Sequence, residues 1–328
     1  MNVITSFLAT LLKYNTPLLY GTVGEIVTEK SGSLNLGVEG TMAIGAIGGL
    51  LVGCRADSLL VGILASFLIA ALVGLFFAFM TVTLHANQNV TGLTITTFGL
   101  GLYFFIGNGF KSAGKWPDML QCEGFLKGTK PIEIPLLSKI PVIGEAFFSQ
   151  SIFVYLAVII AIVMWWYLKY TKPGLRMRAV GENPAAADAV GVNITMYKYV
   201  HIAIGSGIMG IGGLLMAVNL SGSFEGSKCW IDGYGWISIA LVIFAKWNTL
   251  LAILGTFIFG IFNTLQVYGS SLAEHFPKVL GWLNKIPPQF MKALPFIITA
   301  VVLVITSISN KKSDQPAAIG RDYYREER

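Results

Sequence analysis

Charged side chains are scarce in this sequence. Only 12% of the 328 residues are Asp, Glu, Lys or Arg, whereas a soluble domain carries about a quarter. The apolar residues, 54% of the chain, fall in runs of about 20, each long enough to cross a hydrocarbon core about 30 Å thick. Every backbone group in such a run must form its hydrogen bond within the run, so each run is predicted to be helical. The scarcity of charge therefore excludes a soluble enzyme and predicts a polytopic α-helical membrane protein.

Cysteine and histidine are also rare. They stand at Cys54, Cys122 and Cys229 and at His85, His201 and His275. The cysteines are odd in number and far apart, without the spacing of a metal site, so we interpret them as structural thiols. The histidines are widely separated, none belongs to an HExxH motif, and no Ser or Cys has an evident base near it in sequence. We therefore expect no metal site, no cofactor bound by the chain and no catalysis by this chain alone.

Two glycine-containing segments match nucleotide-binding motifs in spelling only. GFKSAGKW at 109–116 nearly matches the phosphate-binding loop, but Trp116 stands where a Mg²⁺-binding hydroxyl is needed. GSGIMG at 205–210 lies inside an apolar run, with no preceding strand and no free helix N-terminus for a pyrophosphate. We interpret the first match as accidental and the second as a feature of helix packing.

Eight apolar runs and one further candidate divide the chain. They cover 8–27, 34–54, 58–83, 90–107, 151–169, 198–219, 233–246 and 249–268, followed by 290–308. The first and the seventh runs are those expected to be interfacial or broken. The predicted fold is all-α: a polytopic transmembrane helical bundle of about eight to nine spans over residues 1–310, with a cytoplasmic tail at 311–328.

Lysine and arginine gather in two places, and cytoplasmic loops carry an excess of both. Lys169, Lys172, Arg176, Arg178 and Lys198 bracket the 171–197 loop, and Lys311, Lys312, Arg321, Arg325 and Arg328 lie in the tail. The net charge of +6 is therefore interpreted as a topology signal, with loop and tail both cytoplasmic. Alternation then places 108–150 and 270–289 outside, although five lysines in 108–150 make the bias imperfect.

The run at 34–54 combines close-packing glycines with polar residues. Gly45, Gly49 and Gly53 recur every fourth residue, which puts them on one helix face and lets a neighbouring helix approach closely. The run begins SGSLNLGVEG, where the glycines weaken a regular helix. Asn35 and Glu39 lie there at or near membrane depth, where polar side chains are expensive. We expect tight helix packing along this run and a broken segment at its start.

A polar, alanine-rich segment, RAVGENPAAADAVGVN at 178–193, separates two apolar runs. Asn183 suits the N-cap of a helix, and Pro184 suits the first helical position. Gly191 suits the left-handed backbone conformation that ends a helix. Residues 184–190 are therefore predicted to form a helix roughly 10 Å long. A helix this short is not stable alone in water. It is either an ordinary interfacial helix lying on the bundle or a docking element for a partner, and its residues leave both readings open.

Two motifs resemble those of a known family. GLRMRAVGENPAAADAVGVN (174–193) resembles the cytoplasmic coupling loop of ABC importer permeases of the branched-chain amino acid, ribose and nucleoside class. EKSGSLNLGVEGTMAIGAIGG (29–49) looks like the other signature of that class. Its LNLGVEG wording is closest to the nucleoside members of the simple-sugar type, which depend on Bmp-family lipoproteins. The 108–150 loop and the tail carry no recognisable match.

This resemblance implies a mechanism and a set of partners. The permease would form half of a pathway with a second permease subunit, expected to be a paralogue, with a copy of this chain as the alternative. A separate cytoplasmic ATPase would bind ATP, and an extracytoplasmic lipoprotein would dock on the 108–150 loop. The setting would be the inner (plasma) membrane of a bacterial cell. The residues implied in ATPase coupling are Arg178, Gly181, Glu182, Asn183, Pro184, Ala186, Asp188 and Gly191.

Polar and aromatic residues in the apolar runs are candidates for the solute pathway. They are Asn35, Glu39, Thr94, Thr97, Phe98 and Asn219. Neutral hydrogen-bonding groups and an aromatic wall suit a nucleoside or related sugar-containing solute that must also be released. Glu39 is alternatively structural, and intramembrane threonines often bond their own backbone. Two other functions stay open: a stand-alone secondary transporter or channel, for which Glu39 would suit ion coupling, and a membrane-anchored scaffold.

Overall fold

The structure is a computed structural model. It describes residues 3–133, 143–282 and 314–324 together with 135, 138, 140, 286, 287, 290, 293, 294, 297, 300, 301 and 304. Helices dominate these residues, and the two strands, β1 (Ile132–Glu133) and β2 (Ser149–Gln150), form one short antiparallel pair. The predicted all-α class is confirmed for this part of the chain.

Five of the described helices are long and apolar enough to span a membrane. They are α2 (Val38–Arg55), α3 (Leu59–Ala78) with its π-helical end η1 (Phe79–Thr83), α4 (Gln88–Ser112), α7 (Ile152–Tyr170) and α10 (Ile194–Asn219). Helix α12 (Thr249–His275) consists of two parts, Thr249–Leu265 and Val267–His275, whose axes differ by 74°. It is a sixth candidate if the two parts are counted as one span. The expected eight to nine spans are therefore not confirmed. Most of 290–308 lies outside the described residues, as do residues 311–313 and 325–328 of the tail.

Two of the expected spans differ from the rest for clear reasons. The seventh run forms α11 (Tyr234–Phe244), whose 11 residues reach roughly 16 Å at 1.5 Å per residue, about half the thickness of a hydrocarbon core. The first run forms α1 (Val3–Lys30), which is long enough but has Glu25 and Glu29 in its second half. This half is buried inside the bundle, so protein rather than lipid surrounds its polar residues.

Helices α2 and α10 lie at the centre of the bundle and cross at glycines. A Cβ on Gly45 would lie 2.5 Å from the Cα of Gly210 in α10, and a Cβ on Gly49 would lie 2.6 Å from the Cβ of Ser66 in α3. The Ser66 hydroxyl contacts two backbone carbonyls, Gly45 O at 2.9 Å and Gly210 O at 2.6 Å. The small-residue stripe at 45, 49 and 53 therefore packs three helices together, as predicted.

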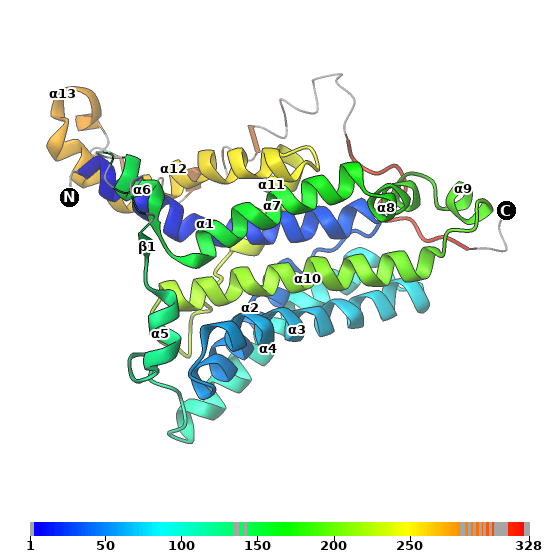
Figure 1. Ribbon diagram of the computed structural model, residues 1–328, viewed down its shortest axis with the longest axis horizontal. Coiled ribbons are helices and arrows are strands. Elements are labelled where there is room, and N and C mark those ends of the chain that lie inside the picture. The colour runs from blue at the N-terminus through cyan, green and yellow to red at the C-terminus, as the bar shows by residue number, and fades with distance from the viewer. Residues whose placement is uncertain are drawn as a thin grey trace.

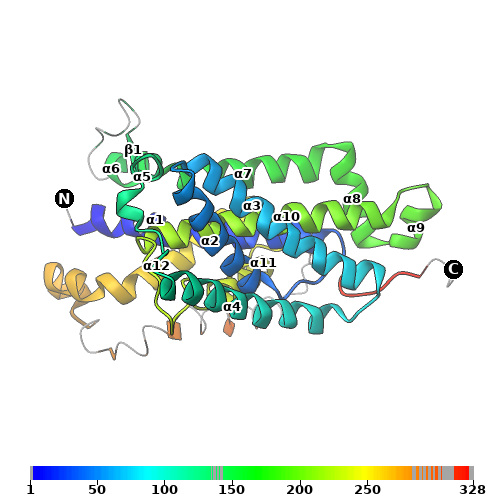
Figure 2. The ribbon, with the colours of Figure 1, turned by 90° about the horizontal axis from the view of Figure 1, so that it is seen from below.

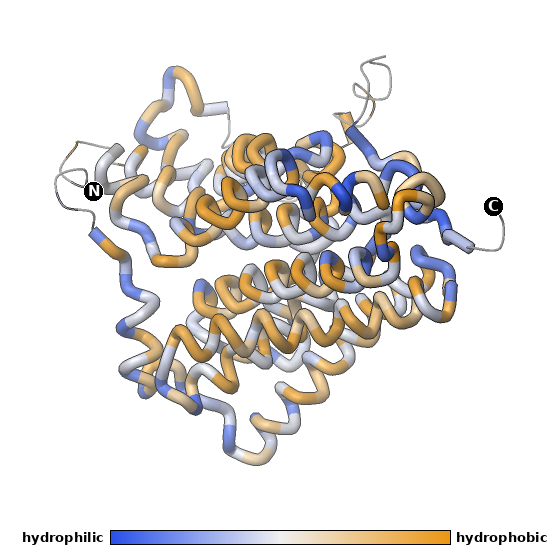
Figure 3. The backbone as a smooth tube through the Cα atoms, turned by 45° about the vertical axis from the view of Figure 1, so that its right-hand side comes forward, coloured by the Kyte–Doolittle hydropathy of each residue, from blue (hydrophilic) through white to orange (hydrophobic). Residues whose placement is uncertain are grey.

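The two ends of the bundle differ. In Figure 1 the long helices run along the long axis, with α8 (Lys172–Glu182), α9 (Pro184–Ala189) and the C-terminus at one end. The 3₁₀ turn η2 (Met119–Gln121) and the short helices α5 (Glu123–Thr129), α6 (Ile143–Phe148) and α13 (Pro277–Leu280) belong to the two loops predicted to lie outside. Of these, α5, α6 and α13 gather at the opposite end in both ribbon views (Figures 1 and 2). Hydrophobic stretches follow the lengths of the helices, and hydrophilic ones concentrate toward the ends (Figure 3).

Candidate functional site

The short helix α9 forms as its sequence predicts. The Asn183 side chain accepts a hydrogen bond from the Ala186 amide at 3.0 Å, and Pro184 occupies the first helical position. The helix spans Pro184–Ala189, one residue less than expected, and Gly191 follows it at φ +80°. That φ is strained for a residue with a side chain but not for glycine. The cap, the proline and the glycine thus define both ends of α9.

One face of α9 is buried and the other is exposed. Ala187 is 2% exposed and packs with Val180 of α8 and Ile194 of α10. Ala186 is exposed on the outer face, and Val190, directly after the helix, is 79% exposed. The helix therefore rests on the bundle through Ala187 while presenting small and apolar side chains outward.

Helix α8, directly before α9, was not expected from the sequence as a separate element. Its signal is the TKPG motif at 171–174: the Thr171 hydroxyl accepts a hydrogen bond from the Gly174 amide at 3.1 Å, and proline stands in the first turn. At its other end, a Cβ on Gly181 would lie 2.3 Å from the Lys30 carbonyl oxygen. Glycine at 181 thus lets α8 lie against the backbone at the end of α1.

Two acidic coupling candidates contact the C-terminal segment. Glu182 accepts a hydrogen bond from the Ala317 amide at 3.2 Å, and Asp188 accepts one from the Tyr323 hydroxyl at 2.9 Å. Arg178 is half-buried and lines a cavity of about 580 Å³ beside α8. The structure therefore brings all eight coupling candidates together on α8, α9 and the turn that follows, and it adds a tail segment that sequence reasoning treated only as basic.

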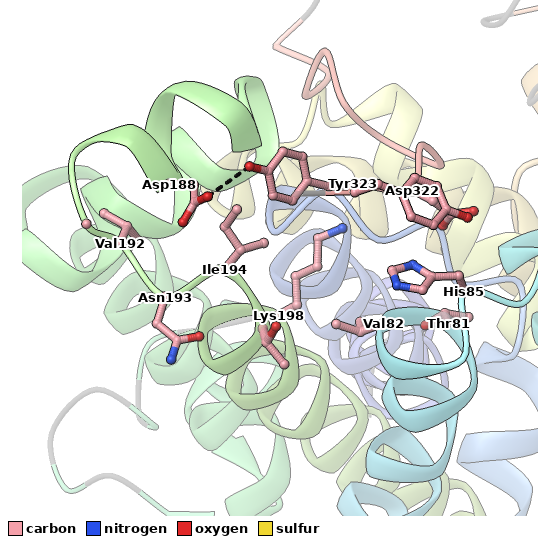
Figure 4. Close-up of a pocket in the computed structure, with 13 residues that line it drawn as sticks. Thr81, Val82, His85, Asp188, Val192, Asn193, Ile194, Lys198, Asp322 and Tyr323 are labelled. Carbon is pink, nitrogen blue, oxygen red and sulfur yellow. Dashed lines mark hydrogen bonds between the residues drawn. The ribbon is translucent and has the colours of Figure 1, made fainter. Parts of the chain in front are cut away.

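A polar cavity of about 640 Å³ opens beside α9. Its lining includes Asp188 of α9, Lys198 of α10, His85 of the turn after η1, and Asp322 and Tyr323 of the tail (Figure 4). The cavity therefore borders α9, the start of α10, the connection between α3 and α4, and the tail.

Glu39 ties the start of α11 to α2. Its Oε1 accepts a hydrogen bond from the Gly233 amide at 2.7 Å, and its Oε2 accepts one from the Gly235 amide at 2.8 Å. Its side chain is 5% exposed. Of the two alternatives for Glu39, its contacts favour the structural role over a role in the solute pathway.

Asn35 belongs to a buried polar cluster that the sequence analysis did not identify. Its backbone amide donates to Glu25 at 3.2 Å, and its side-chain oxygen accepts from the Gly37 amide at 2.8 Å. Glu29, one turn after Glu25, accepts a hydrogen bond from the Trp247 indole. Two carboxyl groups four residues apart in an apolar run (GEIVTE) were the available signal, because such residues are rare at membrane depth.

Three of the remaining pathway candidates share the outer face of α4. Thr94 and Thr97 are exposed, and their hydroxyls donate to the carbonyls four residues earlier, at 2.8 and 3.1 Å. Phe98 is 56% exposed beside them. Asn219 is buried at the end of α10, where its amide donates to the Lys13 carbonyl at 2.8 Å. The six candidates are therefore not gathered at one point: three line an open helix face, and three are buried and bonded to backbone.

No group of three His, Cys, Asp or Glu side chains that could hold a metal ion occurs among the described residues. Cys229, in the loop between α10 and α11, is free and buried, and burial raises the pKa of its thiol to about 11. A thiol with such a pKa stays protonated near neutral pH and is a poor nucleophile.

The family described as "Branched-chain amino acid transport system / permease component" matches residues 7–305 of this chain. This chain belongs to that permease family. No solved structure matches it.

Several curated relatives of this permease are transporter subunits. The nucleoside ABC transporter permease protein NupC of Lactococcus lactis subsp. cremoris is 34% identical over 312 residues, 93% of each chain. The guanosine ABC transporter permease protein NupQ of Bacillus subtilis is 32% identical over 340 residues, 100% of this chain and 99% of the relative. A glucose ABC transporter permease protein of Haloferax volcanii is 27% identical over 271 residues, 79% of this chain and 68% of the relative. The chain is thus an ABC transporter permease and a multi-pass membrane protein.

Proposed function

We propose that this permease is a transmembrane subunit of an ATP-driven ABC importer for a nucleoside or a related sugar-containing solute. Two relatives named for nucleoside or guanosine transport are 34% and 32% identical to it over nearly their whole lengths. Its place is the plasma (inner) membrane of a bacterial cell. It forms half of the pathway together with a second permease subunit, a paralogue or a copy.

The observation that carries this proposal is the geometry of α9. A six-residue helix is too short to be stable alone, and one face of α9 rests on α8 and α10 while Ala186 and Val190 point outward. An exposed apolar valine beside small alanines suits a groove on a partner protein, because burying it there removes apolar surface from water. That partner is the cytoplasmic ATPase, which binds and hydrolyses the ATP.

The pathway runs along the outer face of α4, toward the second permease subunit. Thr94 and Thr97 use their hydroxyl protons within the helix, but each oxygen keeps a lone pair that can accept a hydrogen bond from a sugar hydroxyl. Phe98 offers a ring on which a base can stack. Asn35, Glu39 and Asn219 do not contact the solute in this proposal. Their side chains are buried and bonded to backbone, so their role is to stabilise the packing of the helices. An extracytoplasmic lipoprotein delivers the solute at the opposite end, where α5 and α6 lie.

The alternative of a stand-alone secondary transporter relied on Glu39 as an ion-coupling carboxylate. Both of its oxygens accept backbone hydrogen bonds from the segment ahead of α11, so its contacts favour a structural role. We therefore retain the ABC importer as the proposed function.

Reconstitution tests the proposal directly. Proteoliposomes that contain the permease pair, the ATPase and the binding lipoprotein should take up nucleoside only when ATP is supplied on the ATPase side. Uptake that persists after the ATPase is omitted would support the secondary transporter, and absence of uptake for every nucleoside and for glucose would support the scaffold.

A further inference from the structure

The C-terminal segment 314–324, called the strap below, crosses the end of the bundle that carries α8 and α9 (Figure 1). The Ala318 amide donates to the Gly181 carbonyl at the end of α8, at 3.0 Å. The Gly320 amide donates to the Gly32 carbonyl in the connection between α1 and α2, at 3.3 Å. Ala318 is 8% exposed. The strap therefore links the end of α8 to the connection between α1 and α2.

The strap also holds α9 through one tyrosine. The Tyr323 hydroxyl donates to the Asp188 carboxylate at 2.9 Å, as Figure 4 shows. Its ring packs against the cluster of Val180, Ala187 and Ile194 that seats α9 on the bundle. A hydrogen bond to a charged acceptor is stronger than one between neutral groups, so this contact favours one position of α9 over others.

Beyond Tyr323, the strap reaches the helices that flank the cavity. The Asp322 carboxylate accepts a hydrogen bond from the Gln88 amide, in the first turn of α4, at 3.3 Å. Lys198 of α10 lines the same cavity as Asp322. The Tyr324 ring lies against the His85 imidazole, with centroids 4.5 Å apart. The strap thus joins α9 to α4, the helix whose outer face carries the proposed pathway residues.

We propose that the strap is a second mechanical link between the coupling helix and the transmembrane helices, and that Tyr323 is a positioning residue for α9. The inference rests on the proposed function, since it assigns a route for the motion that the ATPase imposes on α9. One route is covalent, from α9 into α10. The other passes from Asp188 through Tyr323 to α4 and to the connection between α1 and α2, so that both move with α9.

The test compares Tyr323→Phe with Arg321→Gln in the full complex. Tyr323→Phe keeps the ring and removes only the hydroxyl that Asp188 binds. Arg321 is exposed two residues earlier in the same strap and is the matched control. In proteoliposomes with ATPase and lipoprotein, assayed with a panel of labelled nucleosides and glucose, Tyr323→Phe should lower the solute transported per ATP hydrolysed about fivefold. Arg321→Gln should leave that ratio unchanged.

Three further measurements separate positioning from a loss of folding. Co-purification of the ATPase with Tyr323→Phe should match the wild type, while amide hydrogen exchange in 184–190 should become faster. Asp188→Ala combined with Tyr323→Phe should be no worse than Asp188→Ala alone, because both changes break the same contact. A chain ending at residue 313 should lose coupling and regain it when a peptide of residues 314–328 is added.

The outcomes distinguish the strap from the proposed function. If the wild-type complex shows no ATP-dependent uptake of any solute in the panel, the importer function fails and the strap's role fails with it. If wild-type uptake depends on ATP but Tyr323→Phe matches Arg321→Gln in both transport ratio and hydrogen exchange, the strap proposal alone is overturned.

Discussion

Replacing Gly181 by alanine should impair transport by disturbing one backbone contact, that of α8 with the end of α1. A Cβ at this position would lie 2.3 Å from the Lys30 carbonyl oxygen and 3.2 Å from the Gly32 nitrogen, and real Cβ contacts are essentially never shorter than 3.0 Å. Both neighbours are backbone atoms, so no side chain can rotate away, and α8 must move by about 0.7 Å, the difference between 3.0 and 2.3 Å. Overpacking of this kind costs about 1–3 kcal/mol.

The added methyl group weakens the contact between α8 and the end of α1. It also disturbs the hydrogen bond that the Ala318 amide donates to the Gly181 carbonyl. We expect ATP-driven uptake to fall about tenfold, which corresponds to about 1.4 kcal/mol in the transport cycle. The assay is nucleoside uptake by the reconstituted complex, with thermal unfolding in detergent as the measure of folding.

Gly281→Ala is the matched control. It makes the same chemical change directly after α13, away from α8 and α4, where nothing lies within 4 Å of the added Cβ. Uptake and thermal stability should stay at the wild-type level. If Gly181→Ala transports as well as Gly281→Ala, the close contact between α8 and the end of α1 plays no part in coupling.

Three other substitutions test separate parts of the site. Ala186→Arg, on the exposed face of α9, should abolish ATP-dependent uptake without changing thermal unfolding, because a long charged side chain blocks the ATPase groove; normal uptake would argue strongly against docking through α9. Glu39→Gln leaves one acceptor oxygen for the two amides that Glu39 binds, so the free energy of unfolding should fall by about 1–3 kcal/mol; unchanged unfolding in detergent would contradict this role. Trp247→Phe removes the indole donor from Glu29, which is 3% exposed, so the free energy of unfolding in detergent should fall by about 1.5–3 kcal/mol; an unchanged value would contradict a stabilising role for this contact.

Local sequence signals predicted α9 well and several neighbouring features poorly. Asn183, Pro184 and Gly191 define the ends of α9 through bonds and backbone angles within a few residues, so their sequence order was enough. Helix α8 has an equally local cap at Thr171, which was available and was overlooked. The number of spans was harder to predict, because an apolar run such as 233–246 reads the same whether it crosses the membrane or forms the 11-residue helix α11.

The pathway candidates show a different limit. Thr94, Thr97 and Asn35 are all polar residues in apolar runs, and nothing in the sequence distinguishes the exposed face of α4 from the buried connection that holds Asn35. Burial depends on which neighbouring helix covers each face. That choice is made by contacts between residues far apart in the chain, such as Gly45 with Gly210.

The sequence by itself determined that the chain is an α-helical membrane protein with a short capped helix in its most polar loop, because hydropathy and capping depend on residues close together in the chain. Only the tertiary structure decided which groups these residues meet. Glu39 binds Gly233, 194 positions away, and Asp188 binds Tyr323, 135 positions away. Such contacts exist only after the helices have packed, since packing brings a carboxylate and its donors within 3 Å of each other.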